Sequence, residues 1–173
     1  MASKHYPGGS VVVVALMGET QILLIKETTK PAPHYWKLIG ETVEPGESLL
    51  NALIGAVREE AGWNDKNGIP NIGATYEGGK VTAVTDPRIK RIVQFGEKER
   101  VEARCWHWRH FFGVLTTDDM VKKLAGAHLS VDADEEIETQ MFPLAMLETL
   151  PGLMRKHEEL IRSIPKCKMV DVK

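Results

Sequence analysis

The chain has 173 residues, enough for one ordinary globular domain with a sizeable core. Apolar residues make up 43% of it, which excludes a disordered acidic or basic tail protein. The 22 Lys and Arg residues nearly balance the 24 Asp and Glu residues, so a surface that binds nucleic acid as a whole is excluded, although a local basic site is not.

The predicted elements begin with a β-hairpin. Two β-branched runs, 11–17 and 21–26, flank a short turn that contains glycine, which is typical of an antiparallel pair. Residues 35–39 are expected to form a short buried strand, and 40–46 a turn-rich segment. The first run is too short for a signal-peptide core, and no small-residue cleavage site follows it.

A helix is predicted over 49–61, because Ser48 is a good N-cap and Gly62 stands where a helix-ending glycine belongs. Further strands are expected at 72–76, 89–95, 101–115 and 137–142, with turns at Gly78-Gly79 and Gly96. Two more helices are expected, over 118–127 with Thr117 or Asp118 as cap, and over 144–164 with a break near Pro151. Interleaved strands and helices around one mixed sheet indicate an α+β or α/β fold, in a single domain over 1–173.

The segment most informative about chemistry is 40–63. A Gly-rich turn that carries Glu44 and Glu47 precedes the predicted helix, and the helix ends in the adjacent pair Glu59 and Glu60. Carboxylates that converge repel one another unless a hard cation lies among them, and oxygen ligands suit Mg²⁺ or Mn²⁺. The plainer alternative is a solvated helix end, since acidic pairs are common on helices.

The spacing within this segment resembles the signature of the Nudix hydrolase superfamily. That signature is Gly, five residues, Glu, seven residues, Arg-Glu, an apolar residue, any residue, Glu-Glu, any residue, Gly and an apolar residue. In this chain Glu47 matches the first Glu, Glu59 and Glu60 match the acidic pair, and Gly62 and Trp63 match its end. The resemblance implies a Nudix fold, an α/β/α sandwich with a mixed β-sheet between helices.

Three positions depart from the signature. Glu41 stands in place of its first Gly, the second of a usual glycine pair, and Gly55-Ala56 replaces its Arg-Glu. In the family, the glutamate at the position of Ala56 helps hold the divalent cation. Three interpretations are open: metal binding persists through Glu47, Glu59, Glu60 and the Gly40 carbonyl, Glu41 supplies a replacement carboxylate, or catalysis is lost and a nucleotide- or RNA-binding module remains.

The resemblance implies a pyrophosphohydrolase that uses Mg²⁺ or Mn²⁺ to cleave a diphosphate linkage in a nucleoside diphosphate derivative. The implied metal ligands are Gly40, Glu59 and Glu60, with Glu47 assisting. Family members often carry a further acidic residue near the last strand, and Glu135 and Glu136 are the candidates for it, as ligand or general base. An ordinary solvated acidic loop is the alternative for these two.

Two residues outside the signature are candidates for substrate binding. Trp36 could stack on a nucleobase or lie buried beside the first strands, and both interpretations stay open. In a strand, Arg109 shares a face with Phe111, and that face either packs into the core or lines a ligand cleft where the guanidinium meets a phosphate.

The expected partner is a nucleotide-type small molecule. The basic cluster at Arg88, Lys90 and Arg91 admits an RNA contact, but acidic residues follow it closely and favour a mixed-charge hairpin. Cys105 and Cys167 are too few for a disulfide scaffold, so a reducing, cytoplasmic setting is expected. No apolar run approaches the roughly 20 residues of a membrane span, and no membrane partner is expected. A homodimer is one option, because many relatives pair through sheet edges or insertions.

Overall fold

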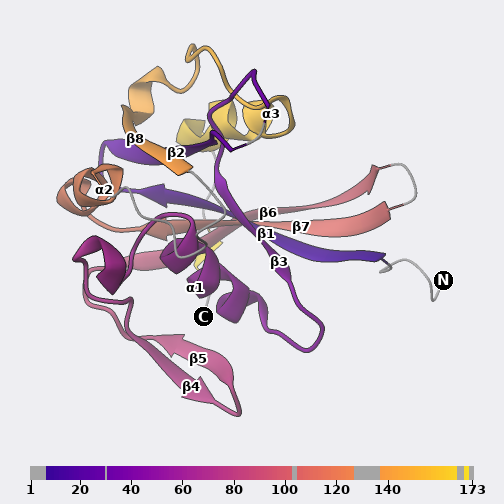
Figure 1. Ribbon diagram of the computed structural model, residues 1–173, viewed down its shortest axis with the longest axis vertical. Coiled ribbons are helices and arrows are strands. Elements are labelled where there is room, and N and C mark those ends of the chain that lie inside the picture. Colours follow the sequence, from indigo (N-terminus) through magenta and orange to yellow (C-terminus); the bar gives the residue numbers. More distant parts are fainter. Residues whose placement is uncertain (1–6, 30, 103–104, 127–136, 167–169, 172–173) are drawn as a thin grey trace.

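The structure is a computed structural model that describes residues 7–29, 31–102, 105–126, 137–166 and 170–171. In this part of the chain, seven strands form one mixed sheet and two more form a separate hairpin (Figure 1). The strands are β1 (Pro7–Met17), β2 (Gln21–Glu27), β3 (Ile39–Val43), β4 (Ala74–Glu77), β5 (Lys80–Val84), β6 (Arg91–Glu102), β7 (Cys105–Leu115), β8 (Ile137–Pro143) and β9 (Val170–Asp171). The helices are α1 (Leu49–Glu59), α2 (Asp118–Ala125) and α3 (Arg155–Ser163), with short 3₁₀ turns η1 (Asp65–Asn67), η2 (Leu144–Met146) and η3 (Ile164–Lys166).

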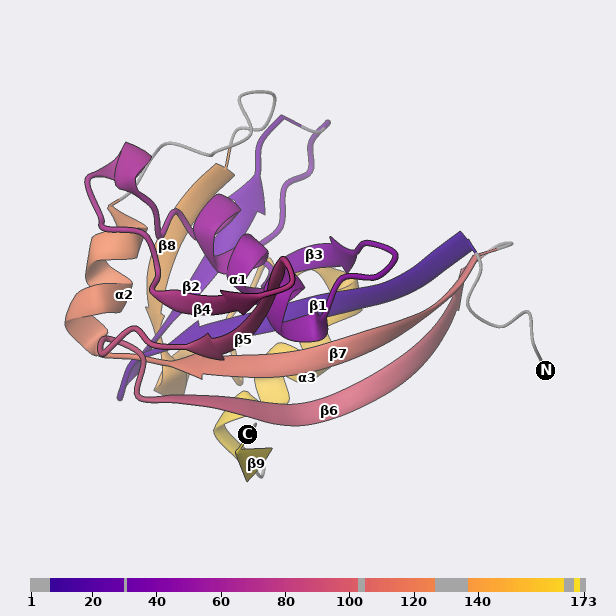
Figure 2. The same ribbon diagram turned by 90° about the horizontal axis from the view of Figure 1, so that it is seen from below.

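Strand β1 lies at the centre of the sheet, whose order is β8-β2-β1-β7-β6-β9, and β3 also pairs with β1. β7 runs parallel beside β1, and Figure 2 shows these two strands and β6 side by side. On its other side, β1 pairs with β3 over residues 10–14 and then with β2 through Leu16 and Met17. We call the place where β1 exchanges β3 for β2 the β2–β3 fork, which comprises residues 25–27 and 37–41.

The two faces of the sheet have separate hydrophobic cores, because side chains alternate along a strand. Val12, Val14 and Leu16 of β1 belong to a core shared with α1 and α2. Val13, Ala15 and Met17 belong to a second core shared with α3 and the segment before it. The sheet therefore lies between helical layers, as expected for an α/β/α arrangement.

Helix α1 has the caps that its sequence predicts. Ser48 Oγ accepts a hydrogen bond of 3.0 Å from the backbone N–H of Asn51, and Gly62 follows the helix with a positive φ of 81°. The apolar side of the helix, including Leu53 and Val57, is buried against the sheet. These contacts fix the end of α1, and with it Glu60, beside β3.

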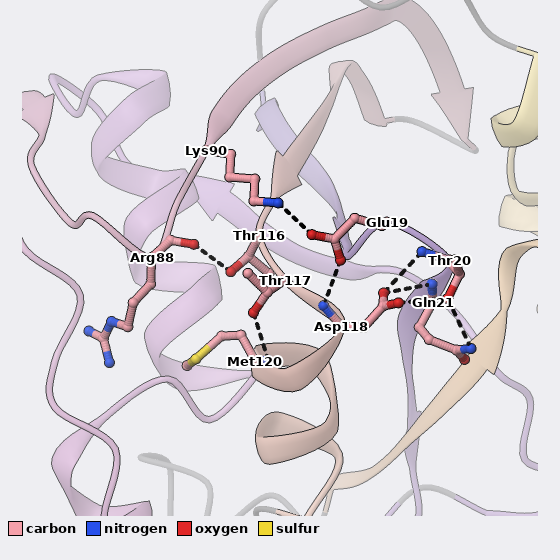
Figure 3. Close-up of polar contacts among 9 residues, drawn as sticks. All are labelled: Glu19, Thr20, Gln21, Arg88, Lys90, Thr116, Thr117, Asp118 and Met120. Carbon is pink, nitrogen blue, oxygen red and sulfur yellow. Dashed lines mark hydrogen bonds and ion pairs between the residues drawn. The ribbon is translucent and has the colours of Figure 1, made fainter.

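The turn between β1 and β2 is bound to the start of α2 by a polar network (Figure 3). Asp118 accepts hydrogen bonds from the backbone N–H groups of Thr20 at 3.0 Å and Gln21 at 3.1 Å, and from the Thr20 hydroxyl at 2.6 Å. Glu19 in turn accepts from the Asp118 backbone N–H at 3.0 Å and pairs with Lys90. Thr117 caps α2 through the N–H of Met120, which confirms one of the two predicted caps.

Several predicted elements differ in extent from those observed. The strand expected over 35–39 is wrong in position: β3 begins at Ile39 and takes in part of the expected turn, because residues 40–43 pair with β1. Gly96 lies inside β6, where the register shifts after Gln94, and not in a turn. Gly78-Gly79 does form a turn, between β4 and the unexpected β5. The helix expected over 144–164 is a 3₁₀ turn and α3, separated on either side of Pro151 as predicted.

Among the described residues, none of the helices combines the length and apolar character needed to cross a membrane.

Candidate functional site

A cavity of about 240 Å³ lies at the β2–β3 fork, between the end of α1 and the start of α3. Its lining combines apolar side chains with side chains of both charges. The residues that line it are Val11, Val13, Glu27, Lys37, Leu38, Gly40, Glu41, Thr42, Glu60, Arg109, Met154, Lys156 and His157.

Two acidic residues of the lining, Glu41 and Glu60, come from β3 and from the end of α1. Glu60 lies just after the last residue of α1, and its Oε2 accepts a hydrogen bond of 2.7 Å from the backbone N–H of Gly40. Burial raises the pKa of Glu60 to about 7, although the Gly40 N–H and the charge of Lys37 act in the opposite direction. The nearby carboxylates of Glu41 and Glu27 raise the pKa of Glu60 further. The charged form of Glu60 is therefore poorly solvated in this cavity.

The cations of the cavity come from separate elements. Lys37 belongs to the segment between β2 and β3, and its ammonium forms an ion pair with Glu27 at 2.5 Å. Arg109 extends from β7, whose backbone pairs with Val11 at this position, and Lys156 belongs to the first turn of α3. Ammonium and guanidinium groups at one cavity are the usual ligands of phosphate oxygens.

His157 connects α3 to the β2–β3 fork. It is buried, and its Nδ1 accepts a hydrogen bond of 3.2 Å from the backbone N–H of Leu38. A ring nitrogen that accepts a hydrogen bond carries no proton, so the ring is neutral with its proton on Nε2. This contact holds the start of α3, which carries Lys156, against Leu38, just before the strand that carries Gly40.

Three of the predicted site residues line this cavity: Gly40, Glu60 and Arg109. Glu41, the unusual residue in the signature, lines it as well. Glu59, next to Glu60, is exposed and is not among the lining residues, since consecutive residues of a helix point in directions about 100° apart. The assignment of catalytic roles to these residues stays a prediction.

The other predicted site residues lie elsewhere or outside the described part of the chain. Glu47 binds the loop to the start of α1, since it accepts hydrogen bonds from the Glu44 N–H at 3.0 Å and from the Asn51 amide at 2.9 Å. Trp36 is partly buried and packs edge-on against Phe142 with ring centroids 5.1 Å apart, and its role in substrate binding stays a prediction. Glu135 and Glu136 lie outside the described residues.

Four titratable residues of the lining were not predicted as site residues from the sequence: Glu27, Lys37, Lys156 and His157. Lys37 lies in the lead-in to the signature, but nothing in its immediate neighbours indicates which way its side chain points. Glu27, Lys156 and His157 come from elements that only the tertiary fold brings to the fork. The approach of α3 to β3 is the feature that a single sequence does not encode locally.

The basic cluster near residue 90 has a structural role. Arg88 forms an ion pair of 2.5 Å with Asp86, and its guanidinium lies 5.0 Å from the centroid of the Trp63 ring. Lys90 pairs with Glu19. Arg88 and Lys90 are therefore paired with carboxylates, but these carboxylates precede the cluster, whereas the predicted mixed-charge hairpin relied on the acidic residues that follow it.

A comparison with protein-family models matches the NUDIX domain over residues 7–164. The chain belongs to the Nudix family. The comparison with curated proteins found no match. Solved structures of Nudix proteins are similar to this one over most of its length, at low sequence identity, and they bear out the Nudix fold expected from the signature.

Three of these structures illustrate the likeness. The NUDIX domain of Shewanella oneidensis NrtR, complexed with ADP ribose, has a TM-score of 0.56 and 18% identity, and the match covers 91% of this chain and 86% of that one. A mutT/nudix family protein from Listeria innocua has a TM-score of 0.57 and 18% identity, over 92% and 93% of the two chains. An ADP compounds hydrolase has a TM-score of 0.57 and 12% identity, over 91% and 70%.

Nudix hydrolases typically depend on a divalent metal, and the described residues fit such an ion only in part. They contain no group of three or more His, Cys, Asp or Glu side chains arranged to hold one. Mg²⁺, however, usually keeps several waters and needs one or two protein carboxylates together with substrate phosphates. Glu60 supplies one such carboxylate at the cavity, and its raised pKa is what a nearby cation would relieve.

Proposed function

We propose that this Nudix protein hydrolyses a diphosphate linkage in a nucleoside diphosphate derivative, with Mg²⁺ or Mn²⁺ as cofactor. The observation that supports this most is the composition of the cavity. One space contains the end of the signature helix, with Glu60 and Gly40, and it also contains Arg109 and Lys156 from the other side of the fork. A diphosphate bound together with a divalent cation needs an acidic group to hold the cation and basic groups to bind the phosphate oxygens.

The proposed roles follow from position. Glu60 and the Gly40 carbonyl would hold the cation, and Glu59, which does not line the cavity, would act on it only at longer range. The cation would neutralise charge that develops on the bridging oxygen and lower the pKa of a bound water. Arg109 and Lys156 would bind phosphate oxygens, and the apolar wall at Val11, Val13 and Met154 would exclude water from the bound ligand.

The remaining predicted residues would act around this centre. Glu47 would act indirectly, because its hydrogen bonds hold the loop that carries Glu44 to the start of α1. Glu135 or Glu136 would accept the proton from the attacking water, as the family resemblance implies. Both assignments are part of the proposal.

The departure from the signature at Ala56 lowers the number of carboxylates available to the cation. Ala56 is 0% exposed and packs in the core beneath α1, one turn before Glu60. Glu41 lies in the cavity and acts electrostatically on Glu60, so it is the candidate for a second carboxylate. We therefore propose a site with one cation, which is completed by phosphate oxygens of the substrate.

A second candidate function is binding without hydrolysis. The ammonium of Lys37, largely buried in its pair with Glu27, already lines the cavity, and the chain has Ala56 where the signature has a carboxylate. Together these two features favour a module that recognises a nucleotide. RNA is the less favoured ligand, because the cluster at Arg88 and Lys90 is engaged in ion pairs.

The two candidates are separated by a substrate panel. Purified protein is incubated with ADP-ribose, ADP, other nucleotide sugars, dinucleoside polyphosphates and nucleoside triphosphates, with Mg²⁺, with Mn²⁺ and with EDTA. The first two compounds come first because one similar structure is a NUDIX domain complexed with ADP ribose and another is that of an ADP compounds hydrolase. Metal-dependent release of phosphate-containing products supports hydrolysis, whereas nucleotide binding by calorimetry without products supports the binding module.

Three further expectations stay predictions: one domain over 1–173, a cytoplasmic location and a homodimer. The dimer is checked by light scattering after size-exclusion chromatography, which distinguishes 19.3 kDa from twice that mass.

A further inference from the structure

The backbone of Lys37 is held in place between β2 and β3. Its backbone N–H donates to the Ile25 carbonyl and its carbonyl accepts from the Ile25 N–H, both at 2.9 Å. This isolated bridge joins the segment before β3 to β2. The Cα atom of Lys37 therefore does not depend on a flexible loop, and its side chain starts from a rigid part of the β2–β3 fork.

The side chain of Lys37 lies in the cavity and is largely removed from water. It is 16% exposed, and its partner Glu27 is 12% exposed. Both residues line the cavity, and the charge of Lys37 also acts on Glu60. An ion pair taken out of water loses hydration that the mutual attraction only partly restores, so such a pair is weak evidence for a purely stabilising role.

We propose that Lys37 is the resident cation of this site, and that it binds a diphosphate directly in the absence of a divalent metal, with Glu27 as its counter-ion while the cavity holds no ligand. The inference rests on the proposed function in one respect, because the ligand class is the diphosphate. An ammonium group has three N–H donors, so Lys37 can add phosphate oxygens to its contact with Glu27 or exchange one for the other.

The charge balance of the cavity supports this role. The signature position at Ala56 lacks a carboxylate, and Lys37 adds a positive charge within reach of the same Glu60. Arg109 and Lys156 add two more positive groups to the lining. Three carboxylates, Glu27, Glu41 and Glu60, line the same cavity, so acids and cations are equal in number there, and a diphosphate can take the place of Glu27 at Lys37.

The test measures binding of inorganic pyrophosphate by calorimetry in EDTA, so that neither metal nor turnover contributes. Wild-type protein should bind pyrophosphate, and Lys37→Gln should weaken binding by about tenfold or more, the usual effect of losing a charge-assisted hydrogen bond. Lys26→Gln is the matched control. Lys26 carries the same charge in a neighbouring position but lies 4.2 Å over the Trp36 ring and is not among the cavity-lining residues.

Glu27→Gln separates ligand binding from a structural role of the pair. If Glu27 competes with the ligand for Lys37, Glu27→Gln should tighten pyrophosphate binding, and Lys37→Gln should cost more in that background than in wild type. Equal loss of affinity in Lys37→Gln, Glu27→Gln and the double variant would instead mean that the pair only stabilises the fold. Melting temperatures of all variants report that stability directly.

Two results would overturn the inference: no pyrophosphate binding by wild type in EDTA, or equal effects of Lys37→Gln and Lys26→Gln. Failure of the proposed hydrolase function looks different. In that case no compound of the substrate panel is cleaved with Mg²⁺ or Mn²⁺, but pyrophosphate binding and its dependence on Lys37 remain.

Discussion

Two carboxylates at helix ends have opposite environments in this protein. Asp118, at the start of α2, accepts hydrogen bonds from Thr20 and Gln21. These bonds lower the pKa of Asp118, and the bond from the Thr20 side chain has the largest effect. Glu60, just after α1, has one such bond to Gly40, and burial raises its pKa to about 7. Asp118, which accepts several hydrogen bonds, joins the β1–β2 turn to α2, whereas Glu60, which accepts one and is largely buried, is the better candidate for a ligand site.

The largest effect is expected from Glu60→Gln. The change keeps the shape and the hydrogen bond to Gly40 but removes the charge that would hold the cation, so we expect kcat for the substrate found in the panel to fall by about 100-fold or more. Initial rates at saturating Mg²⁺ check this. Glu44→Gln, at an exposed position in the same loop, is the matched control and should leave the rate within about twofold of wild type. Equal rates for Glu60→Gln and wild type would remove Glu60 from the mechanism.

Ala56→Glu tests the same comparison by adding a carboxylate to α1, one turn before Glu60. In the absence of metal, a charge at this fully buried position should lower the free energy of unfolding by about 3 kcal/mol. Ala56 and Glu60 are one turn apart on the same face of the helix, so a cation at Glu60 should recover part of the loss. Urea unfolding with EDTA and with Mn²⁺ measures both values. Ala56→Gln should show a loss without metal-dependent recovery, and recovery in both variants would contradict the placement of the cation.

The two carboxylates should also give opposite pH dependences of stability. Asp118 has a folded-state pKa below its unfolded value of 3.8, so its contribution is present above that pH and is lost as the pH falls through the folded pKa. Glu60 has a folded-state pKa of about 7 against 4.5, so stability is lost as the pH rises between these values. Urea titrations from pH 2 to pH 8 should show Asp118→Asn flattening the acid limb and Glu60→Gln flattening the limb that ends near neutrality. The reverse pattern would show that the shifts are assigned to the wrong groups.

The same Asp118→Asn substitution should lower stability at neutral pH by about 1 kcal/mol, because its exposed position weakens each hydrogen bond through solvent. The backbone donors of Thr20 and Gln21 would lose a charged acceptor and keep a neutral one. Thermal unfolding at pH 7 measures the effect. Asp119→Asn, next in the helix and exposed, is the control and should change stability less.

The smallest effect is expected from Gly55→Ala in the middle of α1. A Cβ atom at Gly55 would have no atom within 4 Å apart from its chain neighbours and the backbone of α1 itself, and the residue has no positive φ. The substitution should therefore raise the free energy of unfolding by about 0.5–1 kcal/mol through helix propensity alone. Urea unfolding checks it. A loss of stability would mean that α1 is held in a geometry that only glycine tolerates.

Much of the fold and part of the site could be predicted from the sequence. Ser48 and Gly62 mark the ends of α1, and the β-branched run over 11–17 predicts β1, because both signals are local. The predicted position of β3 was wrong, because the pairing of residues 39–43 with β1 decides where this strand lies, and local turn propensity does not. Glu60 and Gly40 were predicted through the resemblance of segment 40–63 to the Nudix signature. Lys37 and His157 could not be found in this way, because their place in the cavity depends on the approach of distant segments.

The most direct test of the central claim is a crystal structure of the protein with Mn²⁺ and either ADP-ribose or pyrophosphate. Anomalous scattering should place manganese at the Glu60 carboxylate, with the phosphate oxygens of the ligand between it and Lys37 or Arg109. Manganese bound elsewhere, or phosphates outside the cavity at the β2–β3 fork, would contradict the account.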